Sequence, residues 1–246
     1  MSDSPATATA GLRNYVLVTS AYWADTVTDG ATRMLVLYYF YSLGYTPFAV
    51  ASLFIFYEVF GILTNLFGGY LGARFGLKST LFIGLGTQLV ALSMLAFVPQ
   101  AWLVVAWVMV SQALSGIAKD MTKMSSKSAV KLIVPEGASA TLYRWVAILT
   151  GSKNALKGVG FFLGGLLLTL LDFQMALRLL VVLVGSTLIL AAVLMRGGLG
   201  QANRKAKFGQ MFSRNAAVNK LAAARIFLFG ARDVWFVVGL PVFLSS

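Results

Sequence analysis

The feature that most constrains this chain is a series of apolar stretches, each long enough to cross a lipid bilayer as a helix. A bilayer core requires about 20 mostly apolar residues in helical form. We expect seven such helices, over 14–41, 48–72, 79–98, 102–126, 142–170, 176–195 and 221–244. Glycine and proline lie between several of these stretches and favour turns there. The sequence therefore predicts an all-α membrane protein.

The composition of the chain fits a membrane environment. Hydrophobic residues make up 59% of the 246 residues and charged residues 11%, whereas a soluble domain carries about 25% charged residues. Cysteine and histidine are both absent, so the chain lacks a thiol nucleophile and the commonest general base and metal ligand. We therefore expect a protein that is not an enzyme, with no cofactor and no metal site.

The basic residues lie on one side of the predicted membrane. Connections 42–47, 98–101 and 172–175 contain no Lys or Arg. The other connections and helix ends contain Arg13, Arg74, Lys78, Lys131, Arg144, Arg196, Arg204, Lys205, Lys207, Arg214 and Lys220. Positive residues favour the cytoplasmic side, which also explains the net charge of +12 without a nucleic-acid partner. We expect a multi-pass protein of the bacterial inner membrane with a cytoplasmic N-terminus and no cleavable signal peptide.

The helices divide into two unequal parts. We expect a six-helix N-terminal bundle over 1–195, a basic cytoplasmic linker over 196–220, and over 221–246 the first helix of an incomplete C-terminal half. Transporters with two six-helix halves are built as parallel repeats. Gly30-Ala31 in the first helix recurs as Gly230-Ala231 in the seventh. A seventh helix without the other five helices of a second half is unusual for such a fold, so we expect a truncation from twelve helices.

Carboxylates in the first two helices are candidates for proton coupling. Each ionised side chain at a helix centre costs about 2.5–3.5 kcal/mol. Asp25, Asp29 and Arg33 follow at intervals of four and share a helix face. Asp29 and Arg33 could neutralise each other as an ion pair. Alternatively, two carboxylates one turn apart do not both ionise easily, so one holds a proton. Proton coupling would use Asp25, Asp29 or Glu58, which lies near the middle of the second helix.

Cationic side chains inside later helices are candidates for an anion site. Lys153 and Lys157 lie one turn apart within the fifth helix and should repel each other. Either a bound polyanion or pairing with an acid (Asp29, Glu58 or Asp120) would relieve this repulsion. The candidate substrate-binding residues are Arg33, Lys119, Lys123, Lys153, Asn154, Lys157, Arg225 and Arg232. Lys127 and Lys131 fit a solvated cytoplasmic extension of the fourth helix.

Two motifs resemble those of the major facilitator superfamily. Residues 69–78 resemble its loop signature G-x-L-A-D-R-x-G-x-K, with matches at Gly69, Leu71, Arg74, Gly76 and Lys78 and a departure at Ala73. Residues 160–165, Gly-Phe-Phe-Leu-Gly-Gly, resemble the antiporter pattern G-P-x-x-G-G with Phe161 in place of proline. The spacing of small residues at 160 and 164 also favours close helix packing. The resemblance implies a major-facilitator-type six-helix bundle plus a seventh helix.

Longer stretches, over 114–120, 142–165 and 224–236, resemble the organoarsenical efflux permeases of the ArsJ type. The resemblance implies export of 1-arseno-3-phosphoglycerate, arsenate resistance, and a functional link to the glyceraldehyde-3-phosphate dehydrogenase that forms this ester. The residues alone indicate only a small anionic substrate and a lipid bilayer as partners, with transport driven by protons. Another phosphorylated organic anion stays an alternative substrate. A membrane-embedded lipid phosphotransferase and a non-transporting accessory fragment are the alternatives from other classes.

Overall fold

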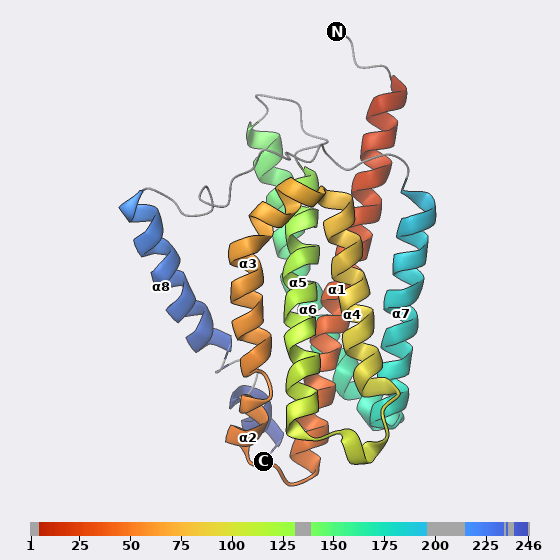
Figure 1. Ribbon diagram of the computed structural model, residues 1–246, viewed down its shortest axis with the longest axis vertical. Coiled ribbons are helices and arrows are strands. Elements are labelled where there is room, and N and C mark those ends of the chain that lie inside the picture. The colour runs from red at the N-terminus through yellow and green to blue at the C-terminus, as the bar shows by residue number, and fades with distance from the viewer. Residues whose placement is uncertain (1–4, 131–138, 196–214, 234, 236–238, 246) are drawn as a thin grey trace.

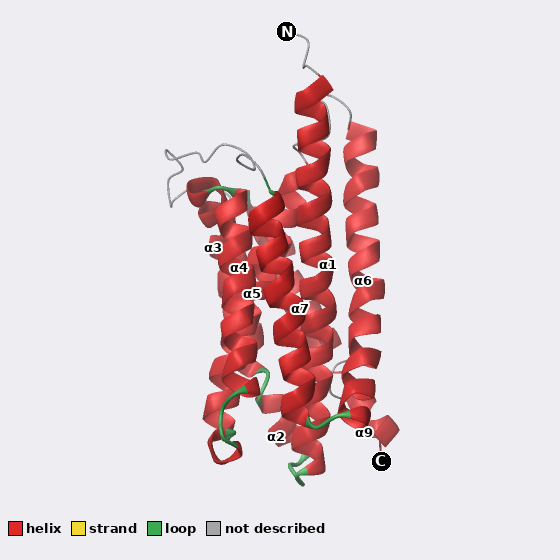
Figure 2. Cartoon of the chain, turned by 90° about the vertical axis from the view of Figure 1, so that its right-hand side faces the viewer, coloured by secondary structure: helices red, strands yellow, loops and turns green. Residues whose placement is uncertain are grey.

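The computed structural model is a bundle of long helices that run up and down side by side (Figure 1). The structure describes residues 5–130, 139–195, 215–233, 235 and 239–245. Its elements there are α1 (Pro5–Ser42), α2 (Pro47–Ser52), α3 (Ile55–Phe75), α4 (Leu77–Ala96), a 3-10 turn (Gln100–Trp102), α5 (Val105–Ala129), α6 (Ser139–Leu170), α7 (Phe173–Leu194), α8 (Ala216–Asp233) and α9 (Leu240–Ser245). The predicted all-α class is confirmed, and Figure 2 shows helices and connecting loops throughout the part that is described.

Three helical segments of the described chain are long and apolar enough to cross a membrane: Pro47–Gly68, Leu77–Ala96 and Phe173–Leu194. On α7, the side chains of Val182, Ile189 and Val193 are 64–70% exposed. A face of this kind suits contact with lipid. Helices α1, α5 and α6 carry the interior charged residues predicted from the sequence, and such residues lower the hydropathy of a span without preventing it from crossing a membrane.

The predicted span over 48–72 is interrupted at residues 53–54, where α2 ends and α3 has yet to begin. Thr46 caps α2, since its hydroxyl accepts a hydrogen bond from the Ala49 backbone N–H at 3.3 Å. Ser52 donates from its hydroxyl to the Ala49 carbonyl at 2.6 Å, and such local bonds compete with helix continuation.

The predicted linker 196–220 lies mostly outside the described residues, and α8 begins at Ala216.

The contacts between helices have an internal symmetry. Helix α1 packs on α6 and α7, and α5 packs on α3 and α4; further contacts join α4 to α7 and α1 to α5. Exchanging α1 with α5, α3 with α6 and α4 with α7 maps these contacts onto themselves. The bundle is therefore built from two three-helix units, the arrangement of nested repeats in transporters.

Helices α1 and α6 are parallel and touch through glycines. A Cβ added at Gly160 would collide with the Val27 carbonyl and lie 3.1 Å from the Cα of Gly30. A Cβ at Gly164 would meet the backbone of Ala31. Real Cβ atoms need about 3.5 Å or more from such neighbours. The predicted close packing through small residues at 160 and 164 is thus confirmed.

The segment with the loop signature joins the ends of three helices. Gly76 has a φ of 82° and lies between α3 and α4, a backbone conformation that favours glycine. Lys78 donates from Nζ to the Met195 carbonyl at 2.8 Å, which ties the start of α4 to the end of α7. Arg74 donates to the Tyr70 hydroxyl. Lys78 of this motif therefore holds two helix ends together, whereas the bond of Arg74 lies within α3.

Candidate functional site

Charged side chains of α1 gather inside the bundle. Asp25, Asp29 and Arg33 lie one turn apart and are 2%, 4% and 2% exposed. Helix α1 occupies a central position, because it contacts α5, α6 and α7 (Figure 1). The four-residue spacing of the three charges therefore directs them to one interior face.

Tyr57 of α3 connects the charges of two other helices. It is fully buried, and its hydroxyl donates to Asp29 Oδ1 at 2.6 Å. The ring centroid lies 3.9 Å from the guanidinium carbon of Arg33 and 3.9 Å from Nζ of Lys119. Cations at this distance are attracted by the ring electrons. Helices α1, α3 and α5 thus meet at one aromatic side chain.

Arg33 forms an ion pair with Glu58 of α3. This pairing corrects the interpretation that Arg33 neutralises Asp29, because the ion pairs formed within the described chain do not include that one. Asp29 lies within electrostatic range of Arg33 but is hydrogen-bonded to Tyr57. The pair is unevenly buried, with Arg33 2% and Glu58 38% exposed. Its carboxylate is therefore less buried than its guanidinium.

The lysines of α5 and α6 approach the same region. Lys123 forms an ion pair with the buried Asp120, at 2.7 Å between Nζ and Oδ1. Lys153 is half-buried and lies within electrostatic range of Lys119, Lys123 and Asp29. Cations are thus prominent among its charged neighbours, which destabilises the site unless a negative charge lies among them.

Lys157 lies one turn beyond Lys153 on α6. Its Nζ is 5.6 Å from the centroid of Phe161, and the side chain is half-buried. Asp29 lies within electrostatic range of Lys157, Arg33 and Lys119. One carboxylate is therefore shared among cations from three helices.

Asp25 is buried, as are Asp29 and Asp120. Its Oδ1 has no hydrogen-bond partner within the described residues, and its charged neighbours are Asp29, Lys119 and Asp120. The hydroxyl of the buried Tyr22 also has no hydrogen-bond partner there. A buried carboxyl group with a carboxylate next to it is suited to hold a proton.

The remaining residues predicted from the sequence have fewer described interactions with this cluster. Asn154 of α6 is exposed. Lys127, expected in a solvated extension, is half-buried and lies within electrostatic range of Lys153. Lys131 and the side chains of Arg225 and Arg232 lie outside the described part of the chain.

Sequence reasoning missed Tyr57, which joins the site together, and Gly116, which makes room for it. A Cβ at Gly116 would collide with the backbone of Tyr57, so α5 can approach α3 only because this position is glycine. The available signal was a phenol directly before Glu58 within an apolar helix. A hydroxyl at such a position usually has a polar partner when buried.

The arrangement has the chemistry of ion binding and proton exchange. Five cations, Arg33, Lys119, Lys123, Lys153 and Lys157, face four carboxyl groups, those of Asp25, Asp29, Glu58 and Asp120. Two of these acids form ion pairs, with Arg33 and with Lys123. If Asp25 holds a proton, the site carries a net positive charge inside the bundle, and burying such a charge is unfavourable unless it is compensated.

Comparison with known proteins gives one family and one fold. The sequence model of the Major Facilitator Superfamily matches residues 18–246. A peptide transporter POT in complex with sulfate has 20% identity and a TM-score of 0.63, covering 94% of this chain and 46% of that one. A POT family transporter in complex with a thioalcohol conjugated peptide has 14% identity and a TM-score of 0.67, covering 91% and 47%. The chain thus spans about half the length of these transporters, which share its fold. No curated protein matches it.

Proposed function

Because the chain belongs to the Major Facilitator Superfamily, a family of multi-pass membrane transporters, we propose that it forms the N-terminal half of a secondary transporter for a multiply charged organic anion. The observation that carries the proposal is the meeting of cations from α1, α5 and α6 around Asp29 and Tyr57. We propose that Lys153 and Lys157 hold anionic oxygens as point charges. Lys119, Lys123 and Arg33 would complete the positive surface, and Asn154 would contribute from its exposed side. We also propose Arg225 and Arg232 as ligands from the predicted seventh helix.

The acids of the site would couple transport to protons. Asp25 is buried beside Asp29 and has an oxygen without a hydrogen-bond partner in the described chain. Export driven by protons would require that the protein change its access state with either the anion or a proton on Asp25 bound, so that protons enter as the anion leaves. The Arg33–Glu58 pair joins α1 to α3, and its opening and closing would accompany the change between the two access states.

From the resemblance to organoarsenical efflux permeases, we propose a substrate and a direction of transport. The candidate is 1-arseno-3-phosphoglycerate, exported from the bacterial cytoplasm across the inner membrane and supplied by a glyceraldehyde-3-phosphate dehydrogenase. Its several negative charges match the surplus of cations in the site. Arsenate resistance would follow from removal of this ester. The asymmetric basic residues support a cytoplasmic N-terminus.

Uptake into everted membrane vesicles tests the proposal. Vesicles from cells that express the complete gene should accumulate arsenic in a saturable way when glyceraldehyde-3-phosphate dehydrogenase, its substrates and arsenate are supplied outside. Phosphate in place of arsenate tests the alternative of another phosphorylated anion. Absence of uptake with both anions would reject the anion carrier, whereas uptake with phosphate alone would reject only the arsenic-specific substrate.

A matched pair of lysine variants tests the site. Lys157→Ala should abolish uptake, because it removes one of the cations proposed to hold the anion, which lies within electrostatic range of Asp29. Lys220→Ala removes an exposed lysine of α8 and should leave uptake unchanged. Expression of both variants is measured in the same membranes. Full uptake by Lys157→Ala would remove Lys157 from the binding site.

A further inference from the structure

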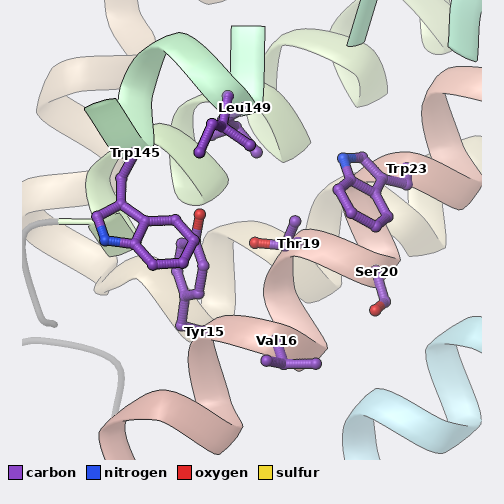
Figure 3. A pocket seen from close by; sticks show the side chains of 8 residues that line it. Tyr15, Val16, Thr19, Ser20, Trp23, Trp145 and Leu149 are labelled. Atoms are coloured by element: carbon purple, nitrogen blue, oxygen red, sulfur yellow. The ribbon is translucent and has the colours of Figure 1, made fainter. Parts of the chain in front are cut away.

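A cavity of about 170 Å³ lies between α1 and α6, on the half of the bundle where both helices begin (Figure 3). Its walls are mainly apolar and aromatic. They include Tyr15, Val16, Ser20 and Trp23 from α1 and Trp145 and Ile148 from α6. We call this cavity the α1/α6 groove.

The groove exists because aromatic side chains separate two helices that elsewhere touch. Tyr15 and Trp145 meet edge to face, with ring centroids 5.5 Å apart. Further along, Trp23 donates from its indole N–H to the Ser152 hydroxyl at 3.1 Å. Only beyond these contacts do the glycines bring the backbones together. The groove is therefore bounded at both ends by ordered side-chain contacts.

The exposed wall of the groove faces away from Lys157, whereas the buried Leu149 in its floor lies one turn from Lys153. Ile148 and Lys157 are nine residues apart on α6, which is two and a half turns, so they lie on opposite sides of that helix. Val16 and Ile148 are 52% and 47% exposed. Exposed apolar walls in a membrane protein, on the side opposite Lys157, indicate an opening toward lipid.

Two arginines lie at the end of the groove where α1 and α6 begin. Arg13 precedes Val16 by three residues and Arg144 precedes Ile148 by four, so each shares a helix face with a groove wall. Because the parallel helices pair Tyr15 with Trp145 and Trp23 with Ser152, Arg13 and Arg144 come level with each other. Both are exposed. The groove thus combines apolar walls with two guanidinium groups at one end.

We propose that the α1/α6 groove binds an anionic phospholipid, with an acyl chain between Val16 and Ile148 and the phosphate between Arg13 and Arg144. Guanidinium groups bind phosphate oxygens in a forked geometry, and tyrosine and tryptophan favour the membrane interface. A zwitterionic headgroup should bind less tightly, because its own positive charge is repelled by the two arginines. The groove contains none of the residues of the charged cluster.

Native mass spectrometry of the chain in detergent tests this assignment. Phosphatidylglycerol and phosphatidylcholine with identical chains are added at equal concentration, and phosphatidylglycerol should bind preferentially with one lipid per chain. Each basic residue near an anionic lipid contributes roughly a five-fold preference. The double variant Arg13→Gln/Arg144→Gln should therefore lose about 25-fold in phosphatidylglycerol binding. The control Arg74→Gln/Lys220→Gln removes the same charge elsewhere and should bind as the parent does.

A second pair of variants tests the groove itself. Val16→Trp fills it and should abolish the single bound phosphatidylglycerol, whereas Val110→Trp, at a 46% exposed valine of α5, should not. Circular dichroism confirms that both fold.

Three results would contradict the proposal. Equal binding of the two lipids, or undiminished phosphatidylglycerol binding in the double arginine variant, would show that the bound lipid is non-specific. A lipid-free dimer lost in Val16→Trp would assign the groove to a second copy. Each of these results overturns the proposal.

Discussion

The contact between α1 and α6 makes a sharp prediction about two glycines that lie two residues apart. A Cβ at Gly160 would collide with the Val27 carbonyl and lie 3.1 Å from Gly30 Cα, whereas a Cβ at Gly158 would meet nothing within 4 Å. Both positions lie inside α6. Gly160→Ala should therefore destabilise the protein, and Gly158→Ala should not.

The two effects differ in sign because packing opposes helix propensity at only one position. Replacing glycine by alanine inside a helix stabilises it by about 1 kcal/mol. Overpacking costs about 1–3 kcal/mol, and the upper value applies at Gly160 because the obstructing atoms belong to the backbone of α1, which cannot rotate away. We expect a loss of about 2 kcal/mol for Gly160→Ala and a gain of up to about 1 kcal/mol for Gly158→Ala.

Unfolding of both variants in mixed micelles, followed by circular dichroism as the fraction of denaturing detergent rises, measures the free energy of unfolding. The difference between the variants should be about 3 kcal/mol. Equal stabilities would refute the close approach of α1 and α6 at this point. If Gly158→Ala alone were destabilising, the rotation of α6 about its axis would be wrong.

Three other predictions concern polar contacts. Tyr57→Phe should lose about 1–2 kcal/mol of stability, since it removes a hydrogen bond to a carboxylate but keeps the ring beside two cations, and Tyr57→Leu should lose more; the same micelle titration compares them. Glu58→Gln should destabilise the protein by about 3 kcal/mol because it leaves a buried guanidinium without its ion-pair partner. In a double-mutant cycle, the double variant with Arg33→Met should recover part of that loss. Two residues that do not interact would show no such recovery. Lys78→Met should cost about 1 kcal/mol by removing the bond to the Met195 carbonyl that follows α7, and should speed proteolysis at the α3–α4 connection. Unchanged proteolysis would contradict this role.

The helical class was predictable because its signal is local. A stretch of about 20 apolar residues is sufficient to indicate a span, and the distribution of basic residues supports an orientation without knowledge of which helices touch. Close packing at 160 and 164 could also be predicted, because small residues four apart present a smooth surface on any helix. The interruption at 53–54 was missed, since it follows a local hydrogen bond of the Ser52 hydroxyl within a strongly apolar stretch.

What the sequence by itself determined is which charges lie within helices and which of them share a face of α1. Only the tertiary structure decided their partners. Arg33 is one turn from Asp29 on the same helix, yet its ion pair is with Glu58 of α3, and Asp29 is bound instead by Tyr57. The physical reason is that the energy of a buried charge depends on distances between helices far apart in the chain, and those distances are set by glycines such as Gly116 and Gly160, which let the backbones approach.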